Sequence, residues 1–423
     1  MAATGVRDLA AVERQFLAAL KHDGARLLER WLNDPAVQPE VEPKAGEEPA
    51  GYRSKTVLLN VGWIKLRRPY LRHPARGHGR CPLDSAWGFV ESYSPEVARL
   101  ACRAATVAGS YEAASQDLLT YAGLRLDARQ LQRLVGQIAP VMNRWRQKQG
   151  PAPQAPAGEV MCVGTDGTGA PMRRPYLRGR KGKKGGRART REVKVGTVFT
   201  HRKPTTLEQR PERDHGSTSY LAALVSADQF GPMLRHEAIR RGLGSAKTVV
   251  FLGDGAVWVW KLARNYFPGA VCILDYYHAC EHLNLLAAAL YGEGTGVAKR
   301  RYRLWKKWLL KDRVADIIQQ ATGDLPRKAS ARKPAQLQIN YLVRNRDKLL
   351  YKTFRNAGYF IGSGVVEAGC KIVVGQRFKQ SGMLWSRAGA EHLLAIRCAL
   401  LSGWFDDFWK AYAKSGQALA FAA

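Results

Sequence analysis

The stretch VVFLGDGAVWVW, from Val249 to Trp260, decides the fold of the central part of this chain. Its first half is apolar and has the β-branched and aromatic residues of a buried strand, and its second half has the pattern of a helix start. Asp254 stands between the two halves and is flanked by two glycines. We therefore expect Asp254 at the carboxyl end of a strand, which is where open α/β sheets place ligands and chemistry.

Predicted strands and helices alternate around this stretch. VMCVGTDGTGAPM and REVKVGTVFT predict two strands before it, AVCILD predicts one after it, and residues 218–242 predict a helix. Residues 280–355 break the alternation with a helical pattern rich in Lys and Arg. The alternation indicates an α/β sheet domain, and we interpret the helical block as an insertion into it.

The charge of the chain points to a polyanionic partner. The 423 residues contain 67 Lys and Arg against 35 Asp and Glu, a formal charge of +32. Neutralising phosphates releases counterions, so such a chain binds nucleic acid readily, although a ribosome-associated or simply basic protein remains an alternative. No apolar run reaches the roughly 18 residues of a membrane span, and the first residues do not form a signal peptide. We expect a cytoplasmic, nucleoid-associated protein with no membrane partner and with reduced cysteines.

Two further acids share features with Asp254. Asp166, in VGTDGTG, also follows an apolar strand and is flanked by small residues, and Glu367 lies in GSGVVEAGCK, where a helix begins. Each acid alone is typical of a turn or a helix cap. Three carboxylates brought together would instead bind Mg²⁺ or Mn²⁺, and a pair of such ions can drive in-line attack on a phosphodiester.

Several long motifs occur in a fixed order along the chain. They are TDGTG, REVKVGTVF, FLGDGAVWVWKLA, FPGAVCILDYYHACEHL and GSGVVEAGCKIVVGQRFKQSGMLW, followed by SGWFDDFW. With them the chain resembles the DDE transposases of the ISKra type of bacterial insertion sequences, over residues 160–410. The resemblance implies an RNase H-like mixed sheet with flanking helices, interrupted by an all-helical insertion. It also implies that Asp166, Asp254 and Glu367 are catalytic and bind two Mg²⁺ or Mn²⁺ ions.

The reaction implied by the resemblance is cleavage of a DNA strand by water, followed by attack of the freed 3′-hydroxyl on target DNA. The expected partners are double-stranded DNA, as the terminal inverted repeats of an element and as target, and further copies of the chain in a homodimer or larger assembly. Two alternatives stay open: a DNA-binding protein on the same scaffold without catalysis, and an RNase H-like nuclease without strand transfer.

The predicted organisation has six segments. Residues 1–35 form a helix, because Leu9, Val12, Phe16, Leu20, Leu27 and Trp31 recur at helical spacing. The others are a linker with a degenerate zinc-ribbon-like segment (36–90), a helix-turn-helix-like DNA-binding domain (91–150), the first part of the catalytic domain (158–279), the helical insertion (280–355) and its second part (356–415).

The sequence also contains two possible metal motifs. His278, Glu281 and His282 form H-x-x-E-H, a zinc-protease motif, but the strand directly before it fits a nuclease sheet better. The resemblance implies that Asp275 and His278 are auxiliary to the carboxylate site: they would position DNA or the third acid, or Asp275 would be an auxiliary metal ligand. The alternative is a buried His bonded to Asp275. Near the N-terminus, His73, His78 and Cys81 provide three ligands, so we expect an incomplete ribbon rather than a zinc site.

The run between the first two strands of the sheet is strongly basic. From Arg173 to Arg191 it has ten Lys or Arg, several glycines and no acid, and we expect a phosphate-tracking arm, with a solvated loop as the alternative. Trp305 lies among basic residues, a combination that is typical of nucleic-acid-binding surfaces. Its helical spacing from Trp308 is also typical of two residues that pack in a core. The expected DNA-binding residues are Arg173, Arg174, Arg178, Arg180, Lys181, Lys183, Lys184, Arg187, Arg189, Arg191, Trp305, Lys371, Arg377 and Lys379.

Overall fold

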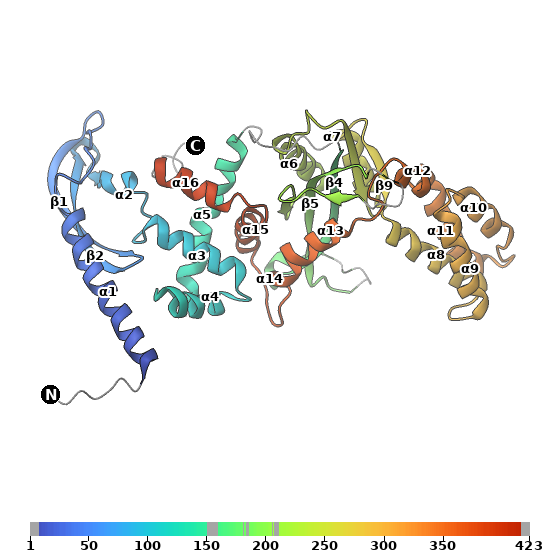
Figure 1. The fold of residues 1–423 in the computed structure, drawn as a ribbon, viewed down its shortest axis with the longest axis horizontal. Coiled ribbons are helices and arrows are strands. Elements are labelled where there is room, and N and C mark those ends of the chain that lie inside the picture. Colours follow the sequence, from blue (N-terminus) through green and yellow to red (C-terminus); the bar gives the residue numbers. More distant parts are fainter. Residues whose placement is uncertain are drawn as a thin grey trace. The chain divides into compact units, whose positions relative to one another are not determined.

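A computed structural model describes residues 8–149, 160–180, 182, 186–204, 206 and 211–415 (Figure 1). The chain divides into two compact units. The first consists of residues Met1–Arg146 and Trp404–Ala423, and the second of Gln147–Gly403. No helix in the described part of the chain is both long and apolar enough to cross a membrane.

The first unit combines a three-stranded antiparallel sheet, in the order β1-β2-β3, with helices. Serine side chains start two of these helices: Ser94 accepts a hydrogen bond from the N–H of Val97, and Ser110 accepts one from that of Ala113. Its elements are α1 (Leu9–Leu32), β1 (Glu48–Leu59), β2 (Gly62–His73), β3 (His78–Arg80), α2 (Pro82–Ala86), α3 (Pro95–Val107), α4 (Tyr111–Asp117), α5 (Ala128–Lys148) and α16 (Phe405–Ser415).

Helix α16 belongs to the first unit, whereas the predicted second part of the catalytic domain extends to residue 415. The chain returns to the first unit at Trp404. The ring of Trp145 lies 5.9 Å from that of Trp404 and 5.6 Å from that of Phe408, so an aromatic cluster holds α16 against α5. The second unit therefore ends at Gly403.

The second unit is built on a six-stranded mixed sheet. Its strand order is β6-β5-β4-β8-β9, and β7 pairs with β5. Strands β4, β8 and β9 are parallel, whereas β5 is antiparallel to β4. The strands are β4 (Val160–Pro171), β5 (Thr190–Arg202), β6 (Glu212–Arg213), β7 (Ser219–Ala223), β8 (Thr248–Gly253) and β9 (Val271–Leu274).

Both faces of this sheet are covered. Met161 and Val163 of β4 face one core with α6 (Ala227–Arg240) and α7 (Val257–Tyr266), and Val160 and Cys162 face another. The second core is shared with a helical block that follows β9. The block consists of α8 (Tyr276–Tyr291), α9 (Gly296–Leu309), α10 (Val314–Gly323), α11 (Ala329–Arg344) and α12 (Tyr351–Asn356).

The sequence predicted one helix over residues 218–242, but the structure has a strand and a helix there. Ser219–Ala223 form strand β7, and the helix begins only at Ala227. Ser226 is the reason, because its side chain and that of Gln229 form a reciprocal capping box at this point. After the helical block the chain ends the unit with α13 (Gly364–Gly369), α14 (Gln376–Phe378) and α15 (Arg387–Leu401).

The aromatic cluster around α16 allows the effect of a substitution on the stability of the first unit to be predicted. Phe408 is fully buried, so Phe408→Ala should destabilise the first unit by about 3–5 kcal/mol through lost burial and a residual cavity. Urea unfolding followed by tryptophan fluorescence would measure the loss. Asp407→Ala, on the exposed side of the same helix, is the matched control and should cost less than about 0.5 kcal/mol. Equal effects of the two substitutions would mean that α16 does not belong to this core.

Candidate active site

Three aspartates lie level with one another in a row across the parallel strands β4, β8 and β9. Gly164 of β4 pairs with Leu252 of β8, and Gly253 of β8 pairs with Leu274 of β9. Continuing these registers places Asp166 level with Asp254, and Asp254 level with Asp275. Because neighbouring strands lie about 4.8 Å apart, the three residues form one row, at the carboxyl ends of β8 and β9, while β4 continues past Asp166 to Pro171.

Asp166 is half-buried beneath the helical segment that follows the block. Its Oδ1 accepts a hydrogen bond from the N–H of Gly167 at 2.6 Å, and the thiol of Cys370 lies 3.5 Å from its Oδ2. Burial is the largest cause of the raised pKa of Asp166, and the charge of Asp254 adds to it, while the Gly167 hydrogen bond opposes both. The charge of Asp254 thus contributes to the environment of Asp166.

Asp254 is held by a short loop and by the helical block. Its Oδ1 accepts a hydrogen bond from the N–H of Ala256 at 2.9 Å. Its main-chain carbonyl accepts one from the hydroxyl of Tyr341 on α11, at 2.8 Å. The Tyr341 ring stacks on His282 of α8 at 3.5 Å between centroids, and His282 Nδ1 lies 2.6 Å from Gln338 Oε1. Helices α8 and α11 therefore fix the peptide that carries Asp254.

Asp275 has a structural role. It is 2% exposed, its Oδ1 accepts from the N–H of His278, and its Oδ2 accepts from the N–H of Ser363. Its own N–H donates to the carbonyl of Gly253. Oδ1 thus caps α8 and Oδ2 fixes the loop before α13, and the role of Asp275 as an auxiliary metal ligand stays a prediction. His278 is bonded to Asp275 through its main chain, but its ring is partly exposed beside Glu281, so the predicted buried His is wrong.

Glu367 lies on α13, which packs on β4. Val366 of this helix covers Gly164 so closely that a Cβ there would lie 2.2 Å from Val366 Cγ2. The Glu367 side chain itself is 64% exposed and pairs with Lys371 Nζ at 2.7 Å. The structure therefore brings its helix to the strand of Asp166 without bringing the carboxylate into the Asp166–Asp254 pair. Within the described ranges, no three His, Cys, Asp or Glu side chains are arranged to hold a metal ion.

Residues of the two other possible metal motifs take part in ring stacking, hydrogen bonding or strand pairing. In H-x-x-E-H, His282 is stacked on Tyr341 and bonded to Gln338, which does not favour a zinc protease. In the first unit, His73 and His78 face each other across β2 and β3. Burial raises the pKa of the Cys81 thiol, so it is less ready to act as a thiolate ligand.

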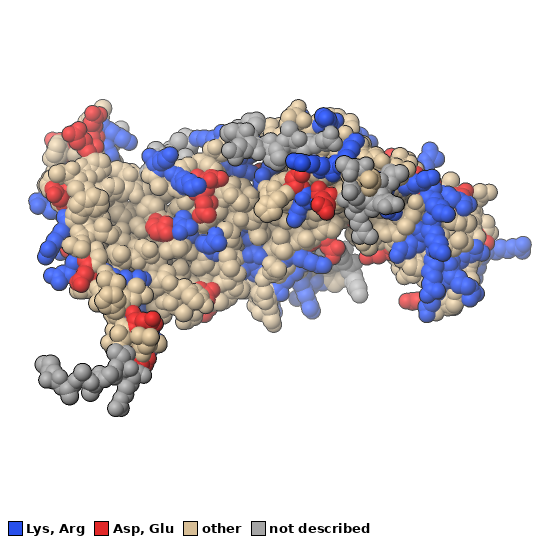
Figure 2. Space-filling model, viewed as in Figure 1, with Lys and Arg blue, Asp and Glu red and all other residues tan. Residues whose placement is uncertain are grey.

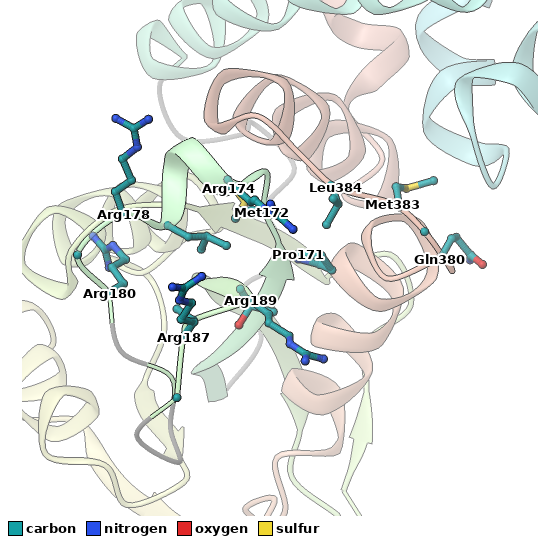
Figure 3. A pocket seen from close by; sticks show the side chains of 16 residues that line it. Pro171, Met172, Arg174, Arg178, Arg180, Arg187, Arg189, Gln380, Met383 and Leu384 are labelled. Carbon is teal, nitrogen blue, oxygen red and sulfur yellow. The ribbon is translucent and has the colours of Figure 1, made fainter.

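The basic run forms one wall of a pocket of about 1330 Å³ (Figure 3). Arg178, Arg180 and Arg187 come from the connection between β4 and β5, and the opposite wall comes from the connection between α14 and α15. Among the described residues, none of those that line the pocket is acidic. Burial lowers the pKa of nearby Arg191, and the charges of Arg180 and Arg387 lower it further, as expected where positive charge is concentrated. The lining residues include Arg174, Arg178, Arg180, Arg187, Arg189, Met172, Gln380, Met383 and Leu384.

The remaining expected DNA-binding residues divide into three groups. Trp305 and Arg377 are 0% and 1% exposed, so neither can contact DNA: Trp305 Nε1 donates to Gln320 in the helical core, and Arg377 Nη1 donates to Met383 Sδ. Lys371 and Lys379 are exposed, and Lys379 donates to Thr168 Oγ1 at 2.7 Å, two residues beyond Asp166. Arg173 is exposed beside the pocket. Lys181, Lys183 and Lys184 lie outside the described residues.

Comparison with known proteins adds little to this geometry. No family model and no curated protein matches the chain. A solved structure titled Drosophila P element transposase strand transfer complex aligns with 77% of this chain and 84% of its own, at 10% identity and a TM-score of 0.28. A match at this TM-score does not establish a common fold.

Sequence reasoning missed two residues of the site, Cys370 and Tyr341. Cys370 follows Glu367 by three positions on a helix, so the spacing alone could have placed it beside that acid. Nothing in the sequence links Tyr341 to Asp254, because the contact joins residues that are 87 positions apart.

The contact between Tyr341 and the Asp254 loop can be tested with two glycines. Gly255 and Gly269 have φ angles of 90° and 80°, so alanine is strained at both by about 1–2 kcal/mol. Only at Gly255 would the new Cβ meet the Tyr341 hydroxyl, at 2.3 Å, whereas Gly269 has open space. We expect Gly255→Ala to lower the free energy of unfolding by at least about 1 kcal/mol more than Gly269→Ala, the typical value of the hydrogen bond at risk. Equal losses would contradict the contact, and adding Tyr341→Phe should recover part of the difference.

The raised pKa of Asp166 predicts a pH-dependent stability. Above that pKa the ionised carboxylate opposes folding, and the penalty disappears as the pH falls below the ordinary pKa of Asp. Asp166→Asn should therefore stabilise the second unit at neutral pH, with a gain that shrinks as the pH is lowered. Thermal unfolding in EDTA at several pH values would measure it. Asp228→Asn, at an exposed pair with Lys261, is the control that should show no such gain. A destabilised Asp166→Asn protein at neutral pH would refute the prediction.

Proposed function

We propose that this chain is a DNA transposase of the ISKra type, with an RNase H-like catalytic domain that cleaves and transfers DNA strands. The observation that carries the proposal is that Asp166 of β4 lies level with Asp254 at the carboxyl end of the parallel strand β8, with the helix of Glu367 packed on β4. A mixed sheet flanked by helices is what this family assignment requires.

The carboxylate pair suits a divalent cation. Burial and the neighbouring charge of Asp254 both disfavour the ionised form of Asp166. A bound cation would stabilise that form. Mg²⁺ or Mn²⁺ bound there would activate the attacking oxygen and stabilise the leaving one. Asp166 and Asp254 would hold the ions, together with Glu367. The exposed pair between Glu367 and Lys371 is worth at most about 0.5 kcal/mol, so it is easily exchanged for a ligand of higher charge.

Basic surfaces on the second unit suit a DNA partner. The Arg-lined pocket begins at Pro171, five residues beyond Asp166 on the same strand, or about 16 Å at the rise of a β-strand. Lys379 lies between the two. A second basic surface covers the helical block, where α9 has six Lys or Arg and no acid and blue side chains gather in Figure 2. Phosphates bound at these surfaces would lead a DNA strand past the carboxylates.

The test is cleavage of labelled duplex DNA that contains the inverted repeats flanking the gene, with Mg²⁺ or Mn²⁺. Asp166→Asn and Asp254→Asn should each lower cleavage by more than about 100-fold while DNA binding is kept. Asp228→Asn makes the same chemical change at an exposed site on α6 and should cleave like the wild type.

Each alternative function has its own result in this assay. If wild type and variants bind the repeats equally and none cleaves, the chain is a DNA-binding scaffold without catalysis. Cleavage without joining of the 3′ end to target DNA would indicate a nuclease. Cleavage that survives both Asp→Asn changes would refute the proposed site.

A further inference from the structure

Helix α1 exposes a long apolar face. Its side chains at helical spacing fall on one side, and each is between 44% and 66% exposed. We define the α1 stripe as Leu9, Val12, Phe16, Leu20, Leu27 and Trp31. From Leu9 to Trp31 it spans about 33 Å at 1.5 Å per residue.

Only the C-terminal half of α1 is anchored to its unit. There Ala25 is buried, Glu29 accepts a hydrogen bond from the N–H of Lys65, and Asn33 bonds to the Lys65 carbonyl and the Arg67 N–H. By contrast, residues 8–20 are exposed apart from Ala11, and the N-terminal turns extend beyond the sheet in Figure 1. A helical stretch this short is marginally stable in water without a partner.

The charge of α1 indicates what kind of partner fits. Residues 8–32 contain four acids (Asp8, Glu13, Asp23, Glu29) and four bases (Arg14, Lys21, Arg26, Arg30), a net charge of zero in a chain of +32. A neutral, apolar helix face offers no positive charge to the phosphates of DNA. Two copies of this chain repel each other over most of their surface, but they can approach at α1 without that cost.

We propose that the α1 stripe is the surface through which two copies of this chain associate, with their α1 helices side by side. Apolar residues that recur every three or four positions form a continuous seam when two such helices pack together. Pairing would cover the stripe and give the projecting half of α1 the packing that it lacks. The inference rests on α1 alone and is independent of the proposed catalysis.

The oligomeric state of the full chain without DNA tests this inference, by sedimentation velocity over a range of concentrations in about 0.5 M salt, where charge repulsion is screened. The wild type should be a dimer. Phe16→Glu/Leu20→Glu should raise the dimer dissociation constant by at least about 10-fold, because it removes two central apolar contacts and places like charges in the seam. Gln15→Glu/Ala18→Glu adds the same charge on the other side of the helix and should leave the constant unchanged.

Phe16 and Leu20 are exposed in the single chain, so their substitution should not unfold it, and circular dichroism would verify this. Leu9→Glu/Leu27→Glu, at the two ends of the stripe, provides a second variant with the same expected result. A monomeric wild type would overturn the inference, whether the stripe then faces solvent or another part of the same chain. So would a dimer that both stripe variants leave intact. Loss of DNA cleavage with an intact dimer would bear only on the catalytic proposal.

Discussion

The second unit depends on the pairing of β8 between β4 and β9. This strand is parallel to both neighbours and buried on both faces, so its register cannot slip without exposing apolar side chains. One consequence is that Asp254 and Asp275, which follow β8 and β9, come level with each other and with Asp166 within β4. The chemistry of the site follows from this alignment, since Asp166, Asp254 and Asp275 need no further contact to lie in one row.

The three aligned aspartates nevertheless have different environments. Asp275 is satisfied by two main-chain N–H groups, and Asp254 accepts one from Ala256. Burial and the charge of Asp254 disfavour the ionised form of Asp166, and the hydrogen bonds from Gly167 and Cys370 offset them only in part. A carboxylate that is costly to ionise in the protein alone is the one that gains most from a ligand of opposite charge. The difference separates a group that builds the fold from groups that are available for chemistry.

Much of this arrangement could be predicted from the sequence, and the failures have physical causes. The apolar run before Asp254 sufficed to predict a strand end, because strand burial and a glycine-flanked turn are local properties. The strand end predicted at Asp166 is wrong, because β4 continues to Pro171 in its pairing with β5. The sequence of β7 was mistaken for helix because its apolar residues also fit helical spacing, and only the capping box at Ser226 separates the two elements. Trp305 and Arg377 were expected on a DNA surface because both types favour nucleic acids, but their burial depends on long-range packing. The local sequence pattern also could not predict the direction in which the Glu367 side chain points.

The hydrogen bond from Tyr341 to the main chain of Asp254 has a consequence for how the helical block and the carboxylates communicate. Because α11 holds the peptide that carries Asp254, any ligand that binds the block and displaces α11 must also shift that carboxylate. If a ligand of the block changed the affinity of these carboxylates for a cation, thermodynamic reciprocity would give the cation the same effect on the affinity for that ligand. The Tyr341 hydroxyl thus ties the position of the Asp254 peptide to that of the helical block.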